Sequence, residues 1–210
     1  MKKLTVFVLG LLLAAPVMAE EINRTLDAAS DGRVHISNIS GSVAVNGWSR
    51  DQVEVTGELG RNVEELIFER DGGKITIKVK VPKKSGRGIE SDLYIQVPQG
   101  SSIDVSTVSA DIDVRKVTGE QSLGTVSGDI DTEGATSDIS AEAVSGDIEV
   151  NGQNKVTNTR ANTVSGDVVL DGVAGVADAA SVSGEVTVVD GSFERIDMNT
   201  VNGEIMFRAG

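Results

Sequence analysis

The sequence predicts an all-β protein: a single-stranded β-solenoid, similar to a parallel β-helix, with about six regular coils of 18–20 residues and an irregular β cap at its N-terminal end. Three observations predict this fold. A hexapeptide of the type Thr-Val-Ser-Gly-Asp-Ile recurs six times, and columns of apolar residues keep a constant offset from it. Aromatic residues make up only 3% of the chain while Gly occurs 24 times, which suits a narrow interior of Val, Ile and Ala.

The first 19 residues, 1–19, have the features of a secretory signal peptide. Lys2 and Lys3 precede an apolar run over 4–15, and Val17-Met18-Ala19 places small residues at a cleavage site. The run is too short to cross a bilayer, and the rest of the chain has no longer one, so we expect no transmembrane segment in the mature protein. The alternative is an uncleaved anchor. We expect an exported protein, periplasmic or at the cell surface.

The net charge limits the classes of partner, and the absence of cysteine limits the sources of stability. The formal net charge is −13, and loss of a segment with two Lys and no acids would give −13 − 2 = −15. Such an acidic chain repels nucleic acid, because phosphate binding needs clustered Lys and Arg. The chain has no Cys, so its stability must come from packing and backbone hydrogen bonds.

Residues 20–100 are predicted to form an N-terminal β region that caps the solenoid. Short alternating segments indicate strands, and Asp71-Gly72-Gly73 indicates a hairpin between Leu66 and Lys80. The other expected strands are 34–36, 43–45, 53–55 and 93–97. One early copy of the repeat, Ile39-Ser40-Gly41-Ser42-Val43, also lies here.

Residues 101–210 carry the regular repeats, and 20–210 is expected to be one continuous domain. The third position of the hexapeptide falls at residues 109, 127, 145, 165, 183 and 202, with spacings of 18, 18, 20, 18 and 19. In each copy two short strands meet at a Gly, where we expect a corner with positive φ. The Asn-Gly and Asp-Gly pairs that follow could instead close hairpins, but a constant period favours solenoid corners.

Four apolar columns confirm the register within the sequence. They lie at fixed offsets from the third position of the repeat, and they alternate with polar residues in the manner of half-buried strands. The column three residues after it, for example, is Ile112, Ile130, Ile148, Val168, Val186 and Ile205. Parallel stacking would place these residues directly above one another, about 4.8 Å apart.

These motifs resemble a bacterial family of domains of unknown function whose members are generally described as adhesins. The resemblance rests on the segments 39–48, 53–57 and 93–100 and on the repeated Val-Ser-Gly-Asp-Ile pattern, and it covers nearly all of the mature chain. It implies the β fold and an adhesin-like role. The family brings no catalytic residues, so none is implied for this chain.

Six acidic residues are expected to stack along one edge as an acidic ladder: Asp111, Asp129, Asp147, Asp167, Glu185 and Glu204. Like charges about 5 Å apart repel, so the ladder could bind divalent cations such as Ca²⁺. The alternative is a solvated edge that discourages aggregation. The Gly-Gly-x-Gly-x-Asp calcium repeat is absent from the sequence, and apart from this ladder we assign no metal site and no cofactor.

No catalytic residue is predicted. The corner Ser and Thr residues lack a base, because His35 is the only His and lies about 70 residues before the first of them. A polysaccharide lyase or hydrolase would need paired acids or a calcium site with a basic residue. The basic residues of the solenoid are scattered. We therefore expect a protein that is not an enzyme.

Three further features could contact a partner. Trp48 and Tyr94 could stack on a sugar, although we expect both to pack under the first coil. The basic run Lys78, Lys80, Lys83, Lys84 and Arg87 could touch anionic polysaccharide or lipid headgroups, or form a solvated face. The final strand, with Val201, Ile205 and Phe207, could pair with another chain.

The sequence thus favours an exported, non-catalytic protein of the cell envelope that is adhesin-like or acts as a scaffold. The expected partners are an envelope protein, a polysaccharide, or a second copy bound through the C-terminal coil, and not nucleic acid. A cation-binding module is the first alternative, and a polysaccharide-processing enzyme is the second. The function depends partly on analogy of fold.

Overall fold

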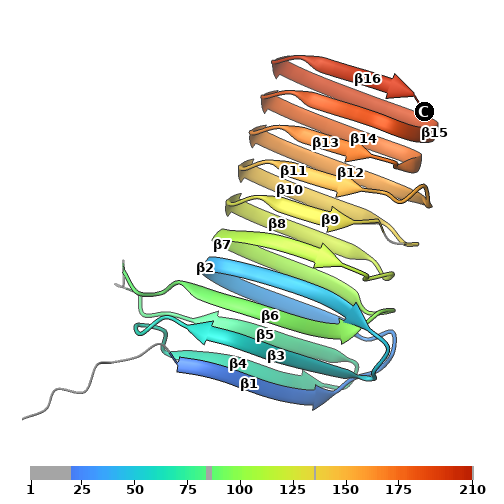
Figure 1. The fold of residues 1–210 in the computed structure, drawn as a ribbon. Helices are drawn as coiled ribbons and strands as arrows, with labels where there is room; N and C mark the ends of the chain where they lie inside the picture. Colours follow the sequence, from blue (N-terminus) through green and yellow to red (C-terminus); the bar gives the residue numbers. More distant parts are fainter. Residues whose placement is uncertain (1–19, 84–86, 135, 210) are drawn as a thin grey trace, which may run out of the picture.

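The computed structural model describes residues 20–83, 87–134 and 136–209. The predicted signal peptide, 1–19, and Lys84 of the basic run lie outside the described residues. The described residues form sixteen β-strands and no helix, so the all-β expectation is confirmed. Figure 1 shows the strands as a stack of flattened turns above a broader base.

Each turn of the chain, here called a coil, passes once through each of two walls that meet at the repeated Gly corner. The first wall precedes the corner and the second wall follows it. β2 (Arg33–Trp48) and β7 (Ser102–Arg115) run through both walls. The later first-wall strands are β8 (Gln121–Ser127), β10 (Ile139–Ser145), β12 (Val156–Ser165) and β14 (Ala174–Ser183).

The second wall continues with β9 (Ile130–Glu133), β11 (Ile148–Asn151) and β13 (Val168–Asp171). β15 (Val186–Asn202) begins in the second wall and turns into the first wall of the next coil, which ends with β16 (Ile205–Ala209). All pairs between successive coils are parallel.

The register of the stack follows the predicted columns. Ile148 pairs with Ile130 on one side and with Val168 on the other, as the period requires. Stacking begins earlier than residue 101, because β2 pairs with β7 along nearly its whole length and places Val43 beside Ile112. The early copy of the repeat at 39–43 is therefore the corner of a coil in the same stack.

The base contains β1 (Glu20–Asp27), β3 (Gln52–Leu59), β4 (Glu65–Asp71), β5 (Lys74–Lys80) and β6 (Ser91–Pro98). β1, β3 and β6 pair antiparallel, and β6 joins β2 in parallel. β4 and β5 form the predicted hairpin, and β5 joins the other wall of β2. Arg24 links β1 to β4 through a 3.1 Å bond from Nη1 to the Leu66 carbonyl.

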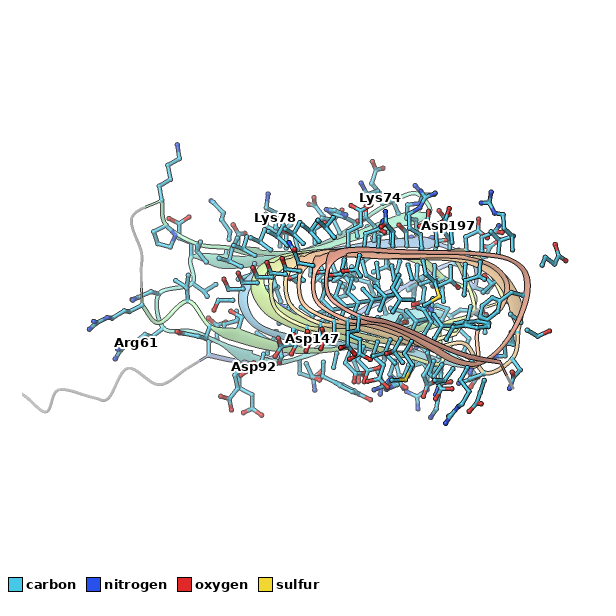
Figure 2. All side chains as sticks on the ribbon, turned by 90° about the horizontal axis from the view of Figure 1, so that it is seen from above. Arg61, Lys74, Lys78, Asp92, Asp147 and Asp197 are labelled. Carbon is cyan, nitrogen blue, oxygen red and sulfur yellow. The ribbon has the colours of Figure 1, made fainter. Side chains whose placement is uncertain are left out.

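The interior is a single apolar core that runs the length of the stack. Seen from above in Figure 2, the coils form a flattened oval filled with side chains. One coil carries a polar pair inside: the Thr132 hydroxyl donates to Gln121 Oε1. The Gln121 amide nitrogen donates to the carbonyls of Val117 and Glu133, so its burial leaves neither end of the amide without a partner.

The corner glycines are required by close packing between coils. A Cβ on Gly146 would lie 1.9 Å from the Gly128 carbonyl oxygen, and one on Gly184 would lie 2.0 Å from that of Gly166. The sequence predicted that each corner needs Gly because its φ is positive. This prediction is wrong for Gly128 and Gly203, whose φ angles are not positive. The corners stack so closely that the carbonyl below occupies the space of a side chain.

Replacing Gly146 by Ala should destabilise the protein by about 1–3 kcal/mol, the usual effect of overpacking. The Tm measured by thermal denaturation should fall by several degrees. The matched control is Gly124→Ala, because the Cβ there would meet only the Val105 carbonyl oxygen at 3.9 Å. Equal Tm values for the two variants would contradict the packing argument.

Candidate functional site: the edge along the glycine corners

The side of the stack where the first wall turns into the second is here called the corner edge. It carries three rows of outward-facing residues, with one member of each row per coil. The valine row is Val108, Val126, Val144, Val164, Val182 and Val201, and the serine row is Ser109, Ser127, Ser145, Ser165, Ser183 and Asn202. The third row is the predicted acidic ladder, of which Asp147 is labelled in Figure 2.

The valine row is exposed, which the sequence analysis missed. Its first five members have exposed fractions of 43–47%, and Val201 reaches 70%. The preceding Thr or Ser of the repeat points inward instead. Its hydroxyl donates to a corner carbonyl, at 2.9 Å from Thr107 to Ala110 and at 3.1 Å from Thr163 to Gly146. The corner therefore buries the polar side chain, whose hydroxyl finds a partner, and exposes the apolar one.

The acidic ladder is held together by hydrogen bonds from backbone to side chain. The backbone N–H of Asp147 donates to Asp129 Oδ1 at 2.9 Å, and Asp147 Oδ1 accepts from the N–H of Asp167 at 2.8 Å. The same bond joins Asp111 to Asp129 and Asp167 to Glu185. These bonds to ionised acceptors offset the repulsion between neighbouring carboxylates. The acids thus have a structural role that the sequence analysis did not predict.

The structure gives no specific geometry for a metal. Within residues 20–83, 87–134 and 136–209, no group of three or more His, Cys, Asp or Glu side chains is arranged to hold an ion. The acidic ladder supplies one carboxylate per coil, with one oxygen already bonded to the next coil at four of its positions. Calcium binding by the ladder stays a prediction.

A second acidic group lies on the outer face of the second wall, around Arg115. Its Nη2 atom is 2.6 Å from Asp131 and 2.9 Å from Asp113, and its Nε atom is 4.0 Å from Glu133. Burial raises the pKa of Asp113, while the charge of Arg115 acts in the opposite direction. Arg115 therefore partly neutralises this face, and the sequence analysis had counted it only among the scattered basic residues.

The other predicted candidates do not form one site. His35 lies in β2 with Nδ1 3.1 Å from Asp104. Trp48 ends β2 half-buried, donates from Nε1 to the Gln52 carbonyl, and lies 4.8 Å below the guanidinium of Arg50. Tyr94 lies on the outer face of β6 and is exposed, so the expectation that it packs is wrong.

The basic run is divided by the fold. Lys78 and Lys80 project from the outer face of β5, and Lys80 pairs with Glu64 at 3.5 Å. Lys83 and Arg87 lie on either side of residues 84–86, which are outside the described residues, and the Arg87 carbonyl accepts a bond from Asn62.

A shallow groove of about 400 Å³ crosses the outer face of the first wall. It gathers charges of both signs that are far apart in the sequence. Arg160 lies 3.6 Å from Asp178, so this pair is partly neutralised. The other charged residues along the groove are Glu120, Asp138 and Arg195. The mixed lining gives the groove no strong preference for an anion or a cation.

The last coil exposes apolar residues. Ile205 and Phe207 belong to columns that are buried in the preceding coils, but here they have exposed fractions of 49% and 51%. Among the described residues β16 pairs with β15 alone. The predicted partner edge of Val201, Ile205 and Phe207 is thus accessible, with Phe193 6.1 Å from Phe207 between ring centroids.

Comparisons with known proteins identify the family and support the fold. The family described as Toastrack DUF4097 matches residues 33–209. A candidate adhesin of Bacteroides fragilis has a similar structure, with a TM-score of 0.54 and 13% identity over 91% of this chain and 97% of its own. A candidate cell adhesion protein of Clostridium sporogenes has a TM-score of 0.49 and 11% identity, over 92% and 100%. No curated protein matches the chain.

The structural role of the ladder predicts a difference between two substitutions at Asp147. Asp147→Ala removes an acceptor and should cost about 1–2 kcal/mol, whereas Asp147→Asn keeps a carbonyl oxygen for the Asp167 N–H and should cost less. Urea denaturation at neutral pH measures both. If Asp147→Asn is as destabilising as Asp147→Ala, the hydrogen bond to the Asp167 N–H is not the source of the stability that Asp147 provides.

Proposed function

Since this chain belongs to the Toastrack DUF4097 family, we propose that it is an exported, non-catalytic β-solenoid protein of the cell envelope that acts as an adhesin-like scaffold. The observation that carries the proposal is the corner edge, where the same outward residues recur in each coil. A repeated surface on a continuous core suits the binding of an elongated partner without any chemical reaction.

Export is supported by the sequence of residues 1–19. A positively charged N-terminal region, a short apolar run and small residues before the cleavage site are features of a cleaved signal peptide. Among the described residues no helix has the length and apolar character needed to cross a membrane. The candidate adhesin of Bacteroides fragilis, at 13% identity, supports the fold alone.

The scaffold function predicts that the folded mature chain binds envelope material. Beads carrying residues 20–210 should retain envelope fragments from the producing bacterium. Beads carrying an unrelated acidic protein of similar charge should not. Retention should fall when Val126, Val144 and Val164 are all replaced by Ser, because this change removes the centre of the valine row. Retention no better than that of the acidic control would refute the scaffold proposal.

We also propose that the last coil mediates pairing of two copies. Among the described residues the outer edge of β16 has no paired strand, and Ile205 and Phe207 lie half-exposed on that coil. Two copies meeting there could continue the hydrogen bonding of the sheet and cover these residues. In such a contact both copies would use the same surface, and a two-fold axis would relate the two copies.

This pairing predicts a dimer that forms as concentration rises, measured by light scattering of the mature chain. The double variant Ile205→Lys/Phe207→Asp should remain monomeric, because it buries charges in the contact. Val108→Asp serves as the control, since Val108 has a comparable exposed fraction of 43% but lies on another coil. A monomer at all concentrations would defeat the pairing.

A further inference from the structure

The valine row and the acidic ladder run side by side along the corner edge. They are separated by the serine row and by the corner residue, which is Ala110 in the first coil and Gly in the others, and both advance by one residue per coil. The parallel register keeps the rows in step, because Ser127 pairs with Ser145 and Ser145 with Ser165. The molecule therefore displays an apolar stripe on the first-wall side of the corner and an anionic stripe on its second-wall side.

The two stripes together select the chemistry of a partner. The half-exposed valines favour contact with apolar side chains, and the adjacent carboxylates favour positive charge. A second copy of this chain does not satisfy both, since facing valine rows would bring two acidic ladders into one contact and the chain carries a net charge of −13. A partner with an apolar face bordered by Lys or Arg satisfies both.

The spacing of the coils favours a helical partner over an extended one. Coils about 4.8 Å apart give the six valines a span of about 24 Å. Along an α-helix each turn advances about 5.4 Å, so one apolar residue per turn stays nearly in step with one valine per coil. Along an extended strand the residues on one face are about 6.7 Å apart, which fits the coils poorly. A helix of about 16 residues would cover the row.

The surface beside the valine row is hollowed. A depression of about 310 Å³ lies along Val126 and Val144 and includes Ser106, Gly124 and Glu142. A Cβ placed on Gly124 would have no atom closer than 3.9 Å, so the depression is open at that point. Large apolar side chains of a helix, such as Leu, would enter this space, and smaller side chains of the same helix would contact the valines.

We propose that the corner edge docks a basic amphipathic α-helix of a partner protein. Its apolar face lies on the valine row, and Lys or Arg along one flank lies against the acidic ladder. This inference rests on the proposed scaffold function and names the class of partner for it. The same carboxylates accept N–H groups of the next coil, so one set of side chains both holds the coils together and recognises the cation.

The test uses a synthetic peptide of about 18 residues built from Leu and Lys, with Leu on one face of the helix. Fluorescence anisotropy with the mature chain should show binding that weakens on adding about 0.5 M salt. A matched peptide with Glu in place of Lys should not bind. The variant Val126→Ser/Val144→Ser/Val164→Ser should weaken binding about tenfold or more, a loss of about 1.4 kcal/mol.

A second variant, Asp129→Asn/Asp147→Asn/Asp167→Asn, removes three charges and keeps the carbonyl acceptors of the ladder. It should weaken binding about tenfold and abolish most of the salt dependence. The control Glu149→Gln/Asp178→Asn/Asp197→Asn removes the same charge outside the corner edge and should bind normally. Circular dichroism verifies that each variant is folded.

Two results would overturn the inference. One is equal weakening by the corner and control charge variants, which would indicate attraction to net charge alone. The other is absence of peptide binding by the folded wild-type chain. If beads still retain envelope fragments in that case, the scaffold function stands and only the class of partner is wrong.

Discussion

The structure depends on backbone hydrogen bonding from coil to coil, which the glycine corners permit. Ile130 donates its N–H to the Asp147 carbonyl, and Ile148 donates to Asp167, so each coil is bonded through the peptide groups of the next. This bonding requires the corners to approach until a carbonyl fills the space of a side chain. The hexapeptide therefore recurs with Gly at the corner in five of its six copies, and the smallest other side chain, Ala110, stands there in the first copy.

The same constraint creates the outer surface. Because the register is constant, any residue type that recurs in the repeat becomes a row on the molecule. The acidic residues add to this bonding, since their side chains accept N–H groups that the corner turns outward. The valines contribute no such bond. Since these side chains are half-exposed and form no hydrogen bond, the stability of the coils does not account for their recurrence.

The interior could be predicted from the sequence, because columns such as Ile112, Ile130 and Ile148 follow directly from a constant period. The hairpin of β4 and β5 could also be predicted, since its turn residues are local. The exposed valine row could not. Strand alternation is interrupted at each corner, so Val126 looks like a core residue until the hydroxyl of its neighbour is seen to bond inside. The Arg115 cluster needs the coils to be stacked before its acids meet.

The central claim is that successive coils are bonded in parallel through their backbones. Scalar coupling across hydrogen bonds, measured by NMR on the isotope-labelled mature chain, detects such bonds one at a time. The account predicts a coupling from the Ile148 nitrogen to the Asp167 carbonyl carbon and another from the Ile130 nitrogen to that of Asp147. Coupling of these nitrogens to carbonyls of an antiparallel neighbour, as in a series of hairpins, would contradict it.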